Sequence, residues 1–326
     1  MKILITGGAG FIGSHLCEEL VNKGHTVICL DDFSNGNLSN IRHLLGSSAS
    51  ALKFKLVFGD IRDRNLVDQV IGSGPEVVVH LAAQIHVDRS VVEPGKTFEI
   101  NALGTLNVLE AARRFDVGRV VYFSSSEVYG SAKFVPMNED HPLAAPHPYG
   151  ASKIAADRLC HSYVDTYGMN IDVLRPFNTF GPRQKGQGYG AAISIFVRRV
   201  LAGYPPLIYG DGLQTRDYMY IDDLVRAVDL VLKSDVRLEG PVNLGTGREV
   251  SITDLAWMII KLCGGENKIE PVHVAPRPGE VRRLVADSSK ARRILGWQAE
   301  IGLEQGLKRF IEWHKSYRLE EWEAPG

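Results

Sequence analysis

The sequence predicts an α/β fold in which a doubly wound parallel sheet is joined to a second, smaller α/β domain. Short runs of apolar and β-branched residues alternate with helix-forming segments through the first half of the chain. Several of these runs are continuously apolar, as expected of strands whose two faces are both buried in a parallel sheet. A glycine-rich turn separates the first run from the first helical segment.

The elements of the first half follow in regular order. We expect strands at Lys2–Thr6, Thr26–Leu30, Lys53–Phe58, Val77–Leu81, Arg119–Ser124 and Ile171–Arg175. Helical patterns lie between them, among them Phe11–Lys23, Thr97–Phe115 and Tyr149–Tyr167. Repeated strand–helix units of this kind predict parallel strands joined by helical crossovers.

The composition changes after Pro176. Residues 177–189 are rich in Gly, Pro and Gln and predict an irregular loop. Helices are then expected at Ala192–Ala202 and Ile221–Leu232, and a further buried strand near residues 242–245. We therefore expect a first domain over residues 1–176, to which the chain returns for about 217–247, and a second domain mainly over 177–326.

Composition excludes several classes of protein. The 326 residues carry a formal net charge of −1, so there is no basic excess of the kind that binds nucleic acid. No apolar run approaches the length of a membrane span, and no secretory signal is recognised. The four cysteines are too widely spaced for a disulfide framework, and the histidines show no metal-ligand spacing. We expect a cytoplasmic protein without a metal.

The segment GGAGFIG at residues 7–13 is the strongest local signal, because it lies between a strand and a helix. Gly7 permits the tight turn, Gly10 allows a pyrophosphate to approach the backbone, and Gly13 allows helix and strand to pack closely. The amide groups of Phe11 and Ile12 at the helix start would face the phosphates. The first domain is therefore expected to be a Rossmann domain that binds a dinucleotide.

The acidic residues Asp31 and Asp32 end the second strand, about 20 residues after the glycines. A carboxylate there accepts hydrogen bonds from the adenosine ribose and repels a 2′-phosphate, which favours NAD over NADP. The other expected cofactor contacts are Asn35, Asp60, Ile61, Leu81, Ala82, Ala83 and Gln84. We expect His80, just before them, to be a packed core residue.

Tyr149 and Lys153 are separated by four positions and so share one face of a helix. A neighbouring ammonium group is expected to lower the pKa of the phenol, which could then exchange a proton with an alcohol. Ser125 follows the strand 119–124, whose carboxyl end is where sheets of this kind bind ligands. Together these three residues predict an alcohol-oxidising site.

These motifs resemble those of the extended short-chain dehydrogenase/reductases, in the NAD-dependent epimerase/dehydratase family. The similarity extends over nearly the whole chain and includes LRPFN at 174–178, GDG at 210–212, TRDY at 215–218 and RPGE at 277–280. Within this superfamily the chain is similar to UDP-glucose 4-epimerases and to nucleotide-sugar dehydratases. The resemblance implies that NAD stays bound and oxidises a nucleotide sugar at C4.

The resemblance also implies roles for individual residues. Ser125 and Tyr149 would hold the C4 oxygen, with Tyr149 as the base, and Lys153 would bind the nicotinamide ribose. Asn178 would contact the sugar diphosphate, which Arg216 and Arg277 would grip, unless these arginines form only surface salt bridges. The full expected substrate set is Ser125, Ser126, Tyr149, Phe177, Asn178, Tyr209, Arg216, Tyr218, Arg277 and Glu280, with residues 186–192 also lining the pocket.

The reaction type depends on Glu127, which is a further candidate catalytic residue. An epimerase needs only reversible hydride transfer, whereas a 4,6-dehydratase also needs an acid and a base, for which Glu127 is a candidate. The segment HVDRS at 86–90 is similar to dehydratases. Ser126 departs from dTDP-glucose dehydratases, which have an aspartate there, although enzymes that resemble GDP-mannose 4,6-dehydratase also have a serine. Glu127 could also be a structural loop residue.

We favour a UDP-glucose-type 4-epimerase. The alternatives are an NDP-hexose 4,6-dehydratase or a UDP-glucuronate decarboxylase that uses Glu127. A non-enzymatic NAD-binding scaffold is disfavoured because Tyr149 and Lys153 are both present. The helices 97–115 and 149–167 carry apolar residues on more than one face, and with the family resemblance this predicts a homodimer.

Overall fold

The computed structural model describes residues 1–326 apart from 47–50, 186–190, 267, 278–279 and 318–326. Its main feature is a seven-stranded sheet with the order β10-β6-β5-β4-β1-β2-β3, in which every pairing is parallel. The strands are β1 (Lys2–Thr6), β2 (Thr26–Asp31), β3 (Phe54–Phe58), β4 (Val77–His80), β5 (Arg119–Phe123), β6 (Ile171–Pro176) and β10 (Val242–Leu244). The predicted doubly wound α/β fold is confirmed.

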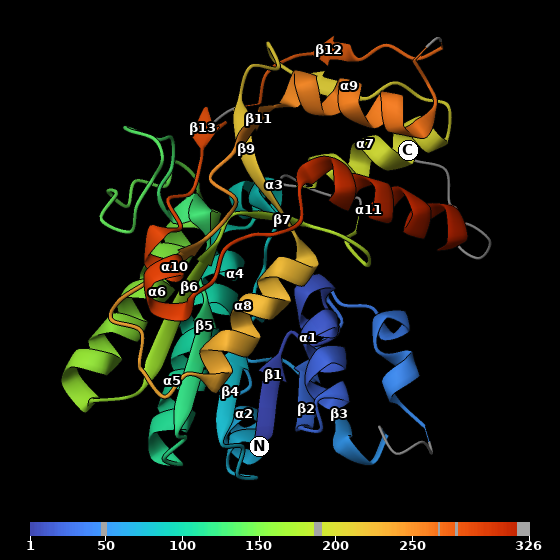
Figure 1. The fold of residues 1–326 in the computed structure, drawn as a ribbon. Coiled ribbons are helices and arrows are strands. Elements are labelled where there is room, and N and C mark those ends of the chain that lie inside the picture. Colours follow the sequence, from blue (N-terminus) through green and yellow to red (C-terminus); the bar gives the residue numbers. More distant parts are fainter. Residues whose placement is uncertain (47–50, 186–190, 267, 278–279, 318–326) are drawn as a thin grey trace.

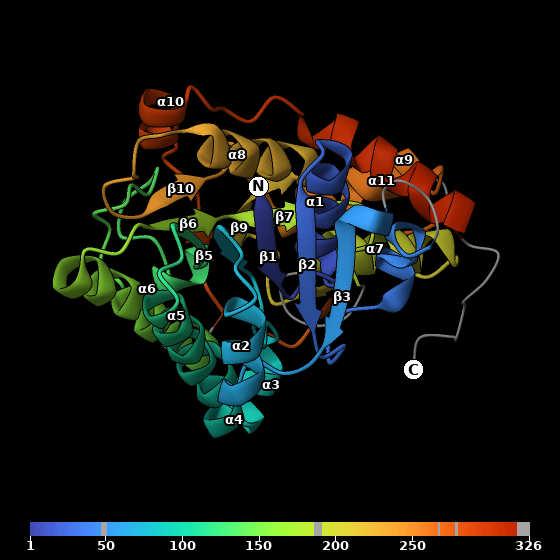
Figure 2. The same cartoon turned by 90° about the horizontal axis from the view of Figure 1, so that it is seen from below.

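Helices cover both faces of this sheet (Figure 2). On one face lie α1 (Phe11–Asn22) and α8 (Ile221–Lys233), and on the other lie α2 (Arg64–Ile71), α5 (Gly104–Arg114) and α6 (Pro148–Tyr167). The alternation along β1 explains the two cores, because Ile3 and Ile5 pack into the cluster with α1 and α8 whereas Leu4 packs into the opposite one. Burial on both faces is why these strands are continuously apolar.

A smaller unit lies above the carboxyl ends of the strands (Figure 1). Its four-stranded sheet consists of β7 (Asn178–Phe180), β9 (Thr215–Tyr220), β11 (Glu249–Ser251) and β13 (Arg283–Leu284), and β8 (Leu207–Tyr209) pairs with β12 (Val272–Val274). Its helices are α7 (Ala192–Leu201), α9 (Ile252–Cys263) and α11 (Leu303–Tyr317), and α10 (Ser289–Leu295) packs near β10. Of the segment 217–247, α8 and β10 pack with the large sheet, whereas most of β9 belongs to the smaller one.

Several local predictions were wrong. The helix expected at 97–115 is divided into α4 (Pro94–Phe98), a π-helical turn (Glu99–Leu103) and α5. That turn directs the buried Asn101 towards the end of β4, where its amide bonds with the backbone N–H and carbonyl of Gln84. The loop expected at 177–189 contains β7, which pairs with β9.

Further elements were not predicted. They are the helices α3 (Val87–Val92), α9, α10 and α11, the strands β8, β9, β11, β12 and β13, and the 3-10 turns Leu38–Asn40, Arg42–Leu44, Ala51–Lys53 and Ser126–Val128. Among the described residues, no helix has both the length and the apolar character that a bilayer crossing requires.

A buried ion pair fixes the floor on which the site is built. Arg175 on β6 donates from Nε and Nη2 to the carboxylate of Asp157 on α6, at 2.9 and 3.0 Å. Ser124, at the end of β5, donates to the same carboxylate at 2.7 Å, and His161 lies 3.5 Å from it. Burial alone would raise the pKa of Asp157, but the hydrogen bonds from His161, Arg175 and Ser124 outweigh it and hold the pKa below its usual range.

We expect Asp157→Asn to lower the free energy of unfolding at neutral pH by about 3 to 5 kcal/mol, because Arg175 would stay buried without its counter-ion. The pKa of Asp157 is lower in the folded than in the unfolded chain, so its contribution is complete above about pH 4 and is lost as the pH falls further. Urea unfolding at several pH values should therefore show a steeper acid loss of stability in the wild type than in the variant.

Asp165→Asn is the matched control, because Asp165 lies on the same helix but is exposed. Its effect should stay within about 0.5 kcal/mol. Equal acid sensitivity of the wild type and Asp157→Asn would contradict the assignment.

Candidate active site

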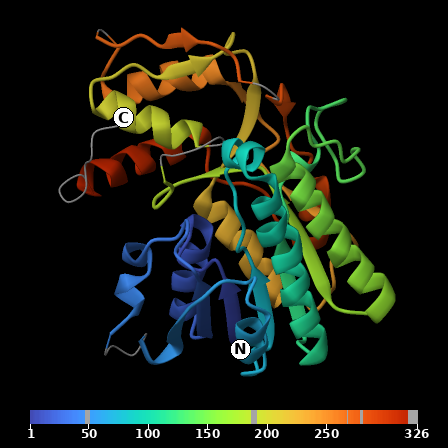
Figure 3. The same cartoon turned by 180° about the vertical axis from the view of Figure 1, so that it is seen from behind.

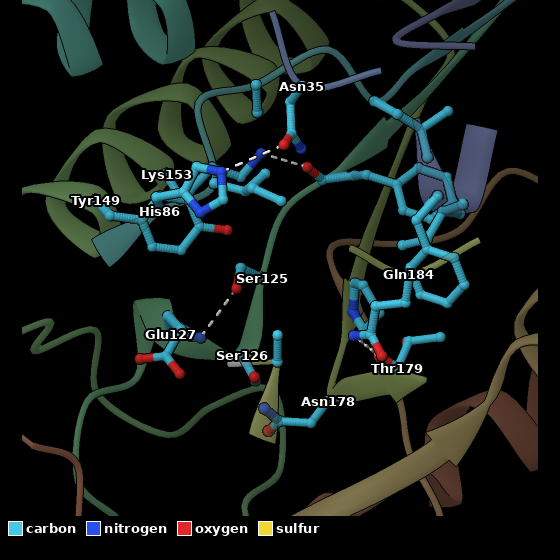
Figure 4. A pocket seen from close by; sticks show the side chains of 18 of the residues that line it. Asn35, His86, Ser125, Ser126, Glu127, Tyr149, Lys153, Asn178, Thr179 and Gln184 are labelled. Carbon is cyan, nitrogen blue, oxygen red and sulfur yellow. Dashed lines mark hydrogen bonds between the residues drawn. The ribbon is translucent and has the colours of Figure 1, made fainter. Parts of the chain in front are cut away.

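Two hollows meet above the carboxyl ends of the parallel strands. The first, of about 290 Å³, is lined by every expected cofactor residue except Lys153: Gly7, Gly10, Phe11, Ile12, Gly13, Asp31, Asp32, Asn35, Asp60, Ile61, Leu81, Ala82, Ala83 and Gln84. The second, of about 240 Å³, is lined by Ser125, Ser126, Glu127, Tyr149, Lys153, Phe177 and Asn178 (Figure 4). Phe11, Ile12, Asn35 and Leu81 line both, so the two hollows are continuous.

The glycine turn is built for a close approach to its backbone. Gly7 has a φ of +72°, and a Cβ there would lie 2.8 Å from the amide nitrogen of Ala82. A Cβ on Gly13 would lie 2.1 Å from the carbonyl oxygen of Gly7. Among the described residues, a Cβ on Gly10 would have only that same oxygen within 4 Å, at 3.2 Å. Gly7 and Gly13 thus shape the turn, and Gly10 leaves its cavity side open, which suits a diphosphate at the start of α1.

Asp31 stabilises this turn directly. Its two carboxylate oxygens accept hydrogen bonds from the backbone N–H groups of Ala9 and Phe33, each at 2.8 Å. Burial raises the pKa of Asp31, and these two backbone bonds partly offset the rise. Each oxygen keeps a lone pair for a second donor such as a ribose hydroxyl. Asp32 accepts from the amide of Ser34 at 2.9 Å and lines the same hollow.

The residues after β3 and β4 are held in place by side-chain bonds. Asp60 pairs with Arg62 at 2.6 Å. Gln84 donates from its amide to Thr97 at 3.0 Å. His80 is bonded through its two ring nitrogens to Thr6 and Thr105, and burial lowers its pKa to about 3. The prediction that His80 is a core residue is therefore confirmed.

Tyr149 and Lys153 lie together at the cavity wall, as their spacing predicts (Figure 4). The expected lowering of the Tyr149 pKa was wrong, because burial raises it to about 12, with a smaller opposing effect of the Ser125 hydrogen bond and a further rise from the charge of Glu127. Lys153 does not offset this, since its Nζ donates to the carbonyl of Phe123 at 2.5 Å. Burial also lowers the pKa of Lys153 to about 8.

Glu127 lies in the short turn that follows Ser125. The hydroxyl of Ser125 accepts a hydrogen bond from the Glu127 amide at 3.2 Å and so caps this turn. The carboxylate of Glu127 is buried, and its Oε2 lies 3.1 Å from Nε2 of His147.

A third hollow, of about 110 Å³, gathers the other expected substrate residues: Asn178, Tyr209, Arg216, Tyr218, Arg277 and Glu280. Arg216 is buried, its Nη2 lies 3.9 Å from Glu280, and the guanidinium of Arg277 stacks 3.8 Å above the ring of Tyr209. This burial does not fit the surface salt bridge considered for Arg216. Asn178 lines both this hollow and the second one, and its Oδ1 is buried without a hydrogen-bond partner among the described residues.

Some lining residues were missed from the sequence. Arg199 and Gln214 line the third hollow and Arg183 lines the second, but their spacing in the chain gives no sign of this. His147, which bonds with Glu127, was also missed. It is the N-cap of α6, directly before Pro148 and Tyr149, and this position was the signal in the sequence that could have identified it. Of the predicted pocket segment 186–192, Ala191 and Ala192 line hollows, and 186–190 lie outside the described residues.

Comparison with known proteins decides the family. The family model described as GDP-mannose 4,6-dehydratase matches residues 4–310. The chain belongs to this family. A UDP-glucose 4-epimerase of Mycolicibacterium smegmatis is 38% identical over 323 residues, 97% of this chain and 99% of that protein.

Two solved structures are similar over almost their whole length. A Thermotoga maritima UDP-glucose 4-epimerase, solved with UDP-glucose, has a TM-score of 0.90 at 34% identity and covers 98% of this chain and 100% of its own. A Streptomyces venezuelae dTDP-glucose 4,6-dehydratase, solved with NAD bound, also has a TM-score of 0.90, at 33% identity and 98% coverage of both chains. The resemblance to the epimerase/dehydratase family of extended short-chain dehydrogenase/reductases is confirmed.

Proposed function

We propose that this protein is an NAD-dependent nucleotide-sugar 4-epimerase acting on a UDP-linked hexose. The observation that carries the proposal is that Ser125, Tyr149 and Lys153 line one hollow, which is continuous with the hollow at the glycine turn. Two proteins named UDP-glucose 4-epimerase, one solved with UDP-glucose, support the substrate class.

Each residue of the site would have its own role in the epimerisation. NAD, when bound, supplies the acceptor and later the donor of the hydride at C4. Tyr149 acts as the base in its phenolate form, which takes the proton of the C4 hydroxyl to become the neutral phenol and returns that proton after the sugar has turned over. Ser125 holds the same oxygen, and Lys153 binds the nicotinamide ribose. No second acid or base is needed for this sequence of steps.

The three hollows support a division of binding roles. The residues of the first hollow, from the glycine turn to Gln84, would hold NAD. They all belong to the proposed NAD-binding part of the chain, residues 1–176, to which the segment at about 217–247 returns. Asn178, whose Oδ1 has no hydrogen-bond partner among the described residues, would contact the sugar diphosphate between the second and third hollows. Arg216 and Arg277 would bind the diphosphate, and Tyr209, Tyr218 and Glu280 the nucleotide, in the mainly substrate-binding part 177–326.

A 4,6-dehydratase or a UDP-glucuronate decarboxylase is the second candidate, supported by Glu127 in the hollow and by the dehydratase among the similar structures. Epimerisation is favoured because one Glu127 oxygen already bonds with His147. A base for C5 would need that carboxylate to be free.

The purified protein should convert UDP-glucose to its C4 epimer without added NAD. UDP-N-acetylglucosamine, UDP-glucuronate, GDP-mannose and dTDP-glucose are tested in parallel, with products read by mass spectrometry and proton NMR. An unchanged mass with new C4 couplings supports the epimerase. Loss of water would replace it by the dehydratase, and loss of carbon dioxide by the decarboxylase.

Tyr149→Phe should reduce turnover by about 10²- to 10⁴-fold, because the C4 oxygen loses its proton acceptor. The same product assay measures this loss, and thermal unfolding verifies the fold. Tyr163→Phe is the control, since Tyr163 lies on the same helix and its hydroxyl bonds with Glu110, away from the hollows. Turnover that survives Tyr149→Phe would remove the tyrosine from the mechanism.

We also propose a homodimer formed by α5 and α6, which run side by side on the outer surface (Figure 3). Leu103, just before α5, is 55% exposed, whereas Val108 and Leu109 are buried against the sheet.

Light scattering should give a dimer at micromolar concentration, and Leu103→Glu should shift the population towards the monomer. Val236→Glu, at an exposed loop position, should leave the mass unchanged, and a wild-type monomer would refute the dimer.

A further inference from the structure

His147 joins the catalytic helix to the loop that carries Ser125 and Glu127. It is the N-cap of α6, the helix that bears Tyr149 and Lys153, and it is buried with only 6% of its surface exposed. Its Nε2 lies 3.1 Å from Oε2 of Glu127, which is also buried. The contact thus links two segments that are separated by 20 positions in the chain.

The helix cap determines which ring nitrogen carries the proton. The backbone N–H of Gly150 donates to Nδ1 of His147 at 3.1 Å. A nitrogen that accepts a hydrogen bond carries no proton, so the proton of the neutral ring lies on Nε2. His147 therefore donates from Nε2, and the Glu127 carboxylate accepts.

Close packing keeps the ring in this place. A Cβ on Gly150 would lie 2.8 Å from the carbonyl oxygen of Glu127 and 2.5 Å from the Cβ of Ala145, so the first turn of α6 rests directly on the Glu127 backbone. On its other side the His147 ring lies nearly parallel to that of Tyr149, with 6.0 Å between centroids and 19° between planes. The imidazole is thus held between Glu127 and the proposed base.

Glu127 is consequently fixed at both ends. His147 holds its carboxylate, and its amide donates to the hydroxyl oxygen of Ser125 at 3.2 Å. That bond occupies one lone pair of the hydroxyl oxygen and leaves the hydroxyl hydrogen for Tyr149 or for the substrate. Figure 4 shows Glu127, Ser125 and Tyr149 in sequence along one wall of the hollow.

We propose that His147 is a positioning residue: by donating from Nε2 it holds Glu127, and through the Glu127 amide it keeps the Ser125 hydroxyl aligned with Tyr149. The inference rests on the proposed function, because it assigns His147 a part in the proton exchange made by Tyr149. His147 itself would touch neither the sugar nor the cofactor.

His147→Asn separates this role from helix capping, because asparagine is also a good N-cap but is too short to reach Glu127. We expect kcat for UDP-glucose to fall by about 10- to 100-fold, the scale on which small displacements of reacting groups act, while KM stays within about twofold. The midpoint of thermal unfolding should change little. A kcat equal to that of the wild type would overturn the proposal.

A double-mutant cycle tests whether His147 acts through Glu127. If it does, adding His147→Asn to Glu127→Ala should cost little further turnover, so the two effects are strongly non-additive. Fully additive effects would overturn the proposed route. His25→Asn is the control, since His25 comes just before β2, at the end of that strand away from the hollows, and lines none of the three; it should keep kcat within about twofold.

The tautomer provides a readout that is independent of turnover. NMR of the protein with isotope-labelled imidazole nitrogens should show the Nε2–H form for the histidine whose signals disappear in His147→Asn. An Nδ1–H form would overturn the proposal whatever the activity. If the wild type converts none of the five nucleotide sugars, the proposed function fails, and the tautomer still tests the contact between His147 and Glu127. If the wild type is active and His147→Asn is equally active, only the role proposed for His147 fails.

Discussion

The parallel pairing of β1 with β4 is the constraint on which the site depends. The chain adds β2 and β3 on one side of β1 and then crosses over to add β4, β5 and β6 on the other, so the connections leave these two central strands in opposite directions. The register of Thr6 with His80 brings the turn after β1 against the backbone after β4. The cofactor hollow forms above this junction, and Ser125 follows the next strand.

A second constraint is the buried pair of Asp157 and Arg175. Two buried charges are tolerated only when their hydrogen-bonding groups are satisfied, and here Ser124 and Tyr129 complete the network. Ser124 is the residue immediately before Ser125, so the end of β5 is held against α6 and β6 together. This buried network therefore fixes the position of the backbone that carries the Ser125 hydroxyl.

Burial sets the chemistry of the proposed base. It raises the pKa of Tyr149 and lowers that of Lys153, so each side chain is biased towards its neutral form. Glu127 adds a negative charge on the same wall and raises the pKa of Tyr149 further. The position of that carboxylate consequently matters for proton exchange, and His147 is the residue that holds it.

The sequence by itself determined the features that follow from local physics. Continuously apolar runs indicated buried parallel strands. The turn after the first strand needs glycine at positions 7 and 13, because a Cβ at either position would collide with nearby backbone. Helical periodicity placed Tyr149 and Lys153 on one face of their helix. Only the tertiary structure decided that Lys153 bonds with Phe123, that His147 bonds with Glu127, and that residues 178–180 form a strand beside β9. These contacts join segments 20 to 40 positions apart, and no local pattern states which distant segments will become neighbours.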